Sequence, residues 1–191
     1  MRRWDLIAEL VGDAESVLDV GCRDKALRDH LPASRYVGLD LEPPADVIGS
    51  AEERLPFPHR EFDCVVLADV LEHLNDPYFA FDEAMRVGDV VVVLLPNMYT
   101  LMIRLQFLRG SLGAKYEFRP ENRLDRHRWV MGYGEAREFV HHRASKGGFH
   151  VERELPFLYP FNRRSVRLLH RLIKPLGPET WAWEYAARLE R

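Results

Sequence analysis

The sequence has few cysteines, no long hydrophobic run and no leading segment of secretory type. Cys22 and Cys64 lie beside apolar stretches, so we expect two buried free thiols, and their spacing predicts no metal site. The longest apolar run, Val90–Leu95, has six residues, far fewer than the roughly 18 of a membrane span. The mixed charges of Met1–Val11 predict no signal peptide. These absences predict a cytoplasmic protein without a transmembrane segment.

Charge is distributed unevenly along the chain. Residues 1–95 carry 9 Lys and Arg against 20 Asp and Glu, and residues 96–191 carry 18 against 10. The two halves therefore have formal charges of −11 and +8, and Arg outnumbers Lys 23 to 4. Codon usage and solvated surfaces explain this pattern without a ligand. The alternative is that the basic half meets an anionic substrate, a partner protein or an anionic surface.

Hydrophobic periodicity predicts alternating strands and helices in one domain that spans residues 1–191. Strands are expected at 16–20, 36–41, 46–48, 62–68, 89–95, 149–155 and, from an alternating pattern, 181–189. Helices are expected at 4–11, 24–31, 77–87, 99–108, 135–145 and 165–174. Because the runs at 62–68 and 89–95 are continuously apolar, we expect a parallel α/β sheet that is buried on both faces.

Acidic residues and a glycine follow the first two predicted strands. Asp19 and Gly21 lie at the end of Ser16–Val20, and Asp40 ends the next strand. Glycine lets the backbone approach a ligand, and a following helix N-terminus favours negative charge. The Asp19 carboxylate suits a ligand ammonium, and Asp40 can bind both hydroxyls of a ribose. This order predicts a nucleotide site; the alternative is a plain α/β domain whose acids only cap helices.

A dinucleotide site is disfavoured by missing glycines. It requires G-x-G-x-x-G after the first strand. Here Gly21 is followed by Cys22, Arg23 and Asp24, and the next glycine is Gly38. The loop therefore lacks the pattern of a pyrophosphate-binding turn.

Taken together, four stretches resemble the class I S-adenosylmethionine-dependent methyltransferases of type 11. They are residues 17–22, 36–40, 51–58 and 61–74; residues 95–97, His127 and 148–149 also look like that family. Residues 87–109 are particularly similar to the MetW group, which is linked to methionine biosynthesis. The resemblance implies a Rossmann-like, doubly wound, mostly parallel sheet of strand order 3-2-1-4-5-7-6 with an antiparallel last strand.

The resemblance also implies S-adenosylmethionine as the cofactor. Asp19 and Gly21 would hold its methionine part, Asp40 would bind its ribose, and the backbone around Ala51 and Glu52 would face its adenine. Residues just beyond the fourth strand would lie beside the methyl-sulfonium. The implied cofactor set comprises Asp19, Gly21, Arg23, Asp40, Leu41, Ala51, Glu52, Asp69 and Val70.

Two departures from the family pattern bear on this cofactor. Arg23 and Lys25 stand where the family usually continues with glycines, and they either block the loop, turn to solvent or pair with the cofactor carboxylate. Ser50 stands where the family often has an aspartate, so Glu52 would have to substitute for it or the contact with adenine is weaker.

Methyl transfer is a direct displacement that mainly needs aligned nucleophile, methyl and sulfur. A general base is optional, and His73 and His127 are the candidates for it. The structural alternatives are a satisfied hydrogen bond at His73 and a packing or lid role for His127. Asn97 and Tyr133 are weaker candidates for the acceptor pocket.

We therefore expect an enzyme that moves a methyl group to a small-molecule or lipid-like acceptor, with the helix and loop at 99–133 covering the acceptor pocket. The alternative is a non-catalytic, MetW-like protein that binds a partner enzyme, with or without cofactor. The basic helix ending at 174 has three alternative interpretations: it packs on the sheet, it lies on an anionic membrane, or it docks a partner. Nucleic acid is not favoured, because the chain lacks a stripe of basic and aromatic residues.

Overall fold

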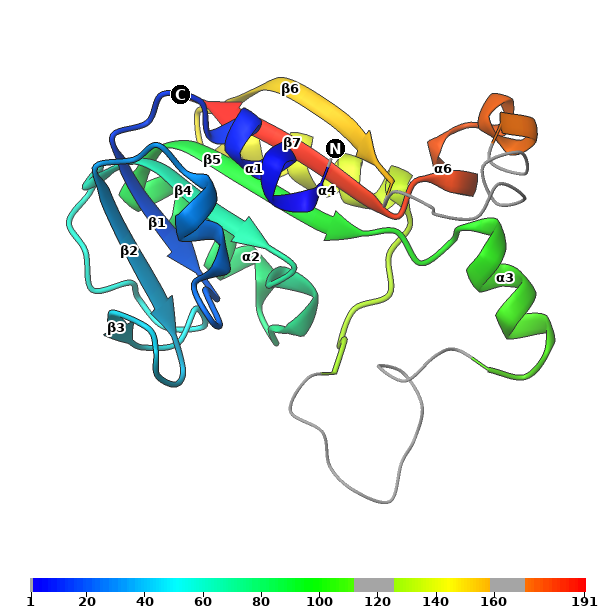
Figure 1. Cartoon of the computed structure of the whole chain (residues 1–191), viewed down its shortest axis with the longest axis horizontal. Coiled ribbons are helices and arrows are strands. Elements are labelled where there is room, and N and C mark those ends of the chain that lie inside the picture. Colours follow the sequence, from blue (N-terminus) through cyan, green and yellow to red (C-terminus); the bar gives the residue numbers. More distant parts are fainter. Residues whose placement is uncertain (1, 112–125, 159–170) are drawn as a thin grey trace.

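The computed structural model describes residues 2–111, 126–158 and 171–191. These residues form a sheet of order β3-β2-β1-β4-β5-β7-β6, which confirms the predicted topology (Figure 1). The strands are β1 (Ser16–Val20), β2 (Arg35–Asp40), β3 (Val47–Ile48), β4 (Phe62–Ala68), β5 (Gly88–Pro96), β6 (His150–Phe157) and β7 (Glu184–Glu190). Strands β1 to β5 pair in parallel, and β7 runs antiparallel to both β5 and β6.

Helices cover both faces of the sheet. Helix α1 (Arg3–Val11) lies on one face, and α2 (Pro77–Val87) and α4 (Tyr133–Lys146) lie on the other (Figure 1). Other helices within the described ranges include α3 (Leu101–Leu108), α6 (Pro178–Trp181) and the 3₁₀ helices η1 (Ala26–His30), η2 (Leu71–His73) and η3 (Lys174–Leu176). Helix α3 follows the carboxyl end of β5 and extends away from the sheet (Figure 1).

Successive residues of the central strands enter opposite cores. Val65 and Leu67 of β4 pack in the cluster that contains the apolar side chains of α2 and α4. Cys64 and Val66 pack in the cluster that contains those of α1. All four are fully buried. Because both faces of β4 are covered, its sequence is continuously apolar rather than alternating.

Several predicted local features are confirmed. Asp76 caps α2 by accepting a hydrogen bond from the Phe79 backbone N–H at 2.9 Å, and Pro77 is the first helical residue. Cys22 and Cys64 are buried free thiols, and burial raises the pKa of each to about 12. Among the described residues, no helix is long and apolar enough to cross a membrane.

Two predicted elements differ in the structure. The helix expected at 24–31 is the short 3₁₀ helix η1, because Lys25 at its start has a left-handed backbone with φ +60°. The last strand begins at Glu184, since Pro178–Trp181 forms α6 and interrupts the alternating pattern. Most of the predicted loop at 111–133 and of the basic helix at 165–174 lies outside the described residues.

Candidate functional site

A cavity of about 620 Å³ lies at the carboxyl ends of β1, β2 and β4. All nine residues of the predicted cofactor set line it: Asp19, Gly21, Arg23, Asp40, Leu41, Ala51, Glu52, Asp69 and Val70. A second hollow of about 670 Å³ lies at the opposite, amino-terminal ends of the strands, and no predicted site residue is among its described lining residues. The parallel β1, β2 and β4 thus gather residues separated by about fifty positions at one edge of the sheet.

Asp19 is the penultimate residue of β1, and its side chain is almost fully buried. Burial raises the pKa of this carboxyl to about 7, although the Tyr36 hydroxyl donates a hydrogen bond to its Oδ2 at 2.6 Å and so opposes the rise. A ligand ammonium beside Asp19 would favour the ionised form. Tyr36 was missed by sequence reasoning; its β2 position pairs with Val17, which makes it a diagonal neighbour of Asp19 on the same face.

Gly21 brings the loop after β1 against the end of β4. Its φ is +73°, and a Cβ at this position would lie 2.5 Å from Cγ2 of Val70. Its backbone N–H donates to the carbonyl of Leu39 at 2.8 Å. Glycine is therefore required both by the backbone conformation and by the close approach.

Arg23 and Lys25 keep the left-handed backbone that glycine would adopt in this loop, with φ of +49° and +60°. The Lys25 ammonium binds Asp46 at 2.5 Å, and Lys25 is not among the described lining residues of the cavity. Arg23 is exposed and lines the cavity. Lys25 therefore shows none of the three expected outcomes, which were blocking the loop, turning to solvent and pairing with the cofactor carboxylate. It pairs instead with Asp46, an acid just before β3.

Asp40 is held in place by backbone donors. The N–H of Arg23 donates to its Oδ2 at 2.7 Å, and the N–H of Leu41 donates to its Oδ1 at 2.6 Å. These bonds orient the carboxylate at the end of β2, and each oxygen retains a further lone pair for a ligand hydroxyl.

Glu52 has a different contact from the one expected. Its carboxylate accepts hydrogen bonds from the backbone N–H and the side-chain amide of Asn75, the latter at 3.0 Å. The acid thus ties the turn at Ser50 to the start of α2. Ser50 supports the same turn by accepting the Glu52 N–H at 3.1 Å.

Helix α1 contributes two residues that the sequence did not indicate. Arg3 and Trp4 line the cavity, and the Arg3 guanidinium contacts Asp69 at 2.7 Å. Asp69 itself has a φ of +56°. Helical periodicity had assigned α1 only to the core, and no local pattern shows that its first turn reaches the end of β4. Left-handed residues are costly, and three of those described—Arg23, Lys25 and Asp69—gather around this edge.

The two predicted histidines meet beside a buried acid. The rings of His73 and His127 lie 4.7 Å apart, edge to face. The Nε2 atoms of His73 and His127 lie 3.8 and 3.9 Å from the same oxygen, Oε1 of Glu72. His73 lines the cavity, whereas His127 is not among its described lining residues. Glu72, fully buried, was missed because it was interpreted only as part of a family stretch.

Asn97, a predicted candidate for the acceptor pocket, joins the end of β5 to the segment before β7. It is buried, and its side-chain amide donates to the carbonyls of Ala182 at 2.8 Å and Glu179 at 3.0 Å. Its Oδ1 accepts the N–H of Tyr99 at 2.9 Å. Tyr133 is buried in the core and packs edge to face on Tyr185.

Comparison with known proteins gives a domain model for part of the chain and similar solved structures. Residues 18–89, which contain all nine predicted cofactor residues, match the model of a methyltransferase domain family. No curated protein matches the chain. A solved SAM-dependent methyltransferase from Archaeoglobus fulgidus is similar, with a TM-score of 0.66 and 17% identity over 99% of this chain and 91% of that one.

Two further solved structures have the same fold. The methyltransferase domain of bacterial CtHen1-C has a TM-score of 0.67 and 16% identity, covering 99% of this chain and 96% of that one. A SAM-dependent methyltransferase from Thermotoga maritima, described as a possible histamine N-methyltransferase, has a TM-score of 0.63 and 14% identity, covering 97% and 87%.

The strand order and flanking helices define a Rossmann-like methyltransferase fold. Residues 18–89 thus match a methyltransferase domain model, and the chain as a whole has the fold of solved SAM-dependent methyltransferases.

Proposed function

We propose that this protein is a methyltransferase that binds S-adenosylmethionine in the 620 Å³ cavity and transfers its methyl group to a small-molecule or lipid-like acceptor. The observation that carries the proposal is that all nine predicted cofactor residues line this one cavity. Its volume lies within the roughly 300–1,000 Å³ typical of small-molecule and cofactor sites. The left-handed Gly21 and the buried Asp19 fit a ligand that brings backbone contact and a positive charge.

When bound, S-adenosylmethionine supplies a methyl group that is activated by a sulfonium. Asp19 would hold the ammonium of the methionine part, and Asp40 would accept hydrogen bonds from the ribose hydroxyls. Gly21 lets the loop backbone approach without a side chain. These residues fix the ligand's position, which is the main requirement of a displacement reaction.

The acceptor class rests on the region after β5. None of the eight residues of α3 is buried, and its exposed apolar side chains include Met102, Phe107 and Leu108. Exposed apolar side chains on the segment that follows β5 favour an apolar acceptor. Similar structures include the small RNA methyltransferase HEN1, at 18% identity and a TM-score of 0.63, and the possible histamine N-methyltransferase. Their acceptors differ greatly in size, so the fold does not choose between them.

Calorimetric titration with S-adenosylmethionine and S-adenosylhomocysteine tests the cofactor site. We expect both to bind, and Asp40→Ala to weaken binding by about 10- to 100-fold, because hydrogen bonds to a charged acceptor are lost. Asp13→Ala, at an exposed aspartate outside the cavity, is the matched control and should bind as the unmodified protein does. Absence of binding at millimolar ligand would refute the proposal. Unchanged affinity in a folded Asp40→Ala variant would mean that the cofactor does not bind at Asp40.

The second candidate is a non-catalytic, MetW-like protein that binds a partner enzyme. The exposed apolar face of α3 supports it, and one similar structure is a complex between the Haloferax volcanii Trm112 methyltransferase activator and a putative methyltransferase (14% identity, TM-score 0.61). The predicted role of the basic C-terminal half toward a partner or an anionic surface belongs to this candidate. Cofactor binding without methyl transfer to any of a broad acceptor panel would favour it.

A further inference from the structure

Glu72, His73 and His127 form a cluster in which one ligand atom from each residue lies within 4.8 Å of the others. We propose that these three side chains bind a divalent transition metal ion at the wall of the cavity, with an open coordination position. Residue spacing does not indicate this site, because Glu72 and His73 are adjacent and His127 is 54 positions further on.

The distances suit a metal better than a direct ion pair. The two Nε2···Oε1 separations of 3.8 and 3.9 Å exceed the length of an N–H···O hydrogen bond. Two ligand atoms that each lie about 2.1 Å from a tetrahedral metal are about 3.4 Å apart. Each of the two Nε2···Oε1 separations would therefore have to shorten by about half an ångström for the nitrogen and the oxygen to share one ion.

The tautomer of His73 that the structure favours is the one that a metal ligand needs. Its Nδ1 lies 3.1 Å from the carbonyl oxygen of Arg126, which can only accept, so Nδ1 carries the proton. The Nε2 lone pair then points to the cluster. A second-shell carbonyl on the other ring nitrogen is the usual companion of a metal-binding histidine.

Backbone contacts hold the two halves of the cluster together. The N–H groups of Arg128 and Trp129 donate to the carbonyl of Glu72 at 2.8 and 3.3 Å. The Arg128 guanidinium donates to the carbonyl of His73 at 2.8 Å, and the Trp129 indole donates to that of Leu74 at 2.8 Å. His127 is thus positioned by the residues on its C-terminal side, which join η2 without using the side chains of the cluster.

Two imidazoles and one carboxylate favour Zn²⁺, Mn²⁺, Fe²⁺ or Co²⁺ over Mg²⁺ or Ca²⁺, which prefer oxygen ligands. Three protein ligands leave a position for water or substrate, as in catalytic rather than structural metal sites. The cluster borders the cavity, because His73, Leu74 and Arg128 all line it. The cluster therefore lies next to the space where an acceptor would lie.

This position suits an acceptor that carries a hydroxyl group, an extension that rests on the proposed function. The ion lowers the pKa of a coordinated hydroxyl, whose proton passes to water. The oxygen then attacks the methyl carbon, the carbon–sulfur bond breaks, and its electron pair stays on the sulfur of S-adenosylhomocysteine. In this arrangement His73 and His127 are metal ligands and not general bases.

The test uses the whole chain, stripped with a chelator and titrated with Co²⁺, Mn²⁺ and Mg²⁺. We expect one Co²⁺ or Mn²⁺ per chain, detected by calorimetry and by the visible spectrum of bound Co²⁺, and much weaker binding of Mg²⁺. Glu72→Gln and His127→Ala should each weaken Co²⁺ binding by about 100-fold or more, since a direct ligand matters at least as much as a second-shell partner. His142→Ala, at an exposed histidine outside the cluster, is the control and should bind normally.

A small oxygen chelator tests the open position. Acetohydroxamate should change the Co²⁺ spectrum of the unmodified protein and not that of protein without metal. No Co²⁺ or Mn²⁺ binding at 1:1 stoichiometry, or unchanged affinity in a folded His127→Ala variant, would overturn the metal site. An unchanged spectrum with acetohydroxamate would overturn the open position. A parallel titration with S-adenosylhomocysteine separates the two proposals, because its cofactor residues and the metal ligands are different side chains.

Discussion

The buried carboxyl of Asp19 makes cofactor affinity depend on pH. Its pKa of about 7 in the free protein means that the proton is retained below neutrality. A ligand ammonium favours the ionised form, so binding must expel this proton whenever the pH is below about 7. We expect affinity for S-adenosylhomocysteine to rise with pH, by up to about tenfold per pH unit, and to level off above about 7.

Titration calorimetry from pH 5.5 to 8.5 measures this dependence. Asp19→Asn carries no titrating proton, so its weaker affinity should vary much less over the same range. A flat profile in the unmodified protein would show that Asp19 does not face the ammonium. Tyr36→Phe removes the hydrogen bond that opposes the rise in pKa, and it should move the plateau to higher pH.

Gly21 is the residue at which the site tolerates no side chain. In Gly21→Ala the new Cβ would meet Val70 at 2.5 Å, and the φ of +73° disfavours any L-residue. We expect a loss of about 2–4 kcal/mol in the free energy of unfolding, combining backbone strain with a steric clash, and a loss of cofactor binding. Denaturant unfolding and calorimetry measure the two effects.

Gly148→Ala separates the two causes. Gly148 has nearly the same φ, +74°, but a Cβ there would meet nothing within 4 Å. This variant should show only the strain, about 1 kcal/mol, and should bind cofactor normally. Equal destabilisation of both variants would mean that the contact with Val70 relaxes freely.

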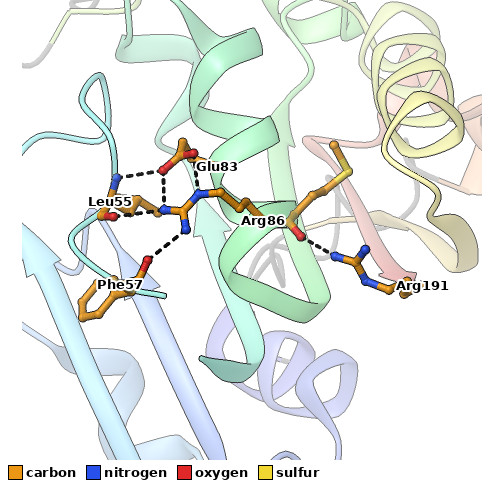
Figure 2. Close-up of polar contacts among 6 residues, drawn as sticks. Leu55, Phe57, Glu83, Arg86 and Arg191 are labelled. Carbon is orange, nitrogen blue, oxygen red and sulfur yellow. Dashed lines mark hydrogen bonds and ion pairs between the residues drawn. The ribbon is translucent and has the colours of Figure 1, made fainter. Parts of the chain in front are cut away.

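At the scale of elements, α2 fixes the segment that leads from the cavity into β4. Figure 2 shows the side chains of Glu83 and Arg86 of α2 hydrogen-bonded to the backbone of the turn at 55–57. Arg86 donates to both carboxylate oxygens of Glu83 at 2.7 Å and to the carbonyls of Leu55 and Phe57 at 3.0 and 2.9 Å. The Arg86 hydrogen bonds hold the pKa of Glu83 below its usual range.

Arg86→Ala should lower the free energy of unfolding by about 2–4 kcal/mol, because it leaves Glu83 buried without its bidentate partner. Urea denaturation at pH 7 measures the loss. Arg60→Ala, which removes an arginine bonded to an exposed acid, Asp89, is the control and should cost less than about 1 kcal/mol. Similar losses in both variants would mean that the α2 network adds little. Glu83 also gives the unmodified protein stability that is lost as pH falls through its lowered pKa, and Arg86→Ala should reduce this acid sensitivity.

Local sequence patterns predicted the central strands but not the contacts between distant elements. The strands β1 and β4 were predicted with their observed bounds, because burial on both faces leaves a continuous apolar pattern. The change from helix to η1 and the late start of β7 depend on Lys25 and Pro178, whose effects are local and weak in sequence. Glu72 and His127 come together through long-range contacts, among them the backbone bonds of residues 128 and 129, which no periodicity encodes.

For the whole molecule, the sheet is the reason that the cofactor side was predictable. Parallel strands end at one edge, so acids placed at three strand ends must converge there once the strand order is known. Other lining residues do not lie at strand ends. Arg3 and Trp4 belong to α1, which lies on a face of the sheet, and Arg128 belongs to a segment far along the chain. Their arrival depends on packing angles, which hydrophobic patterns do not specify.

The left-handed backbone at Arg23 and Lys25 has a consequence for how such sites diversify. The loop retains the curvature of a glycine turn while the Lys25 side chain makes a charged contact with Asp46, so shape and composition vary separately. A lineage can therefore exchange loop glycines for cations one at a time, at about 1 kcal/mol each, and acquire new surface charge beside an intact binding edge. Searches that count glycines would overlook such chains, whereas the two acids and the sign of φ would identify them.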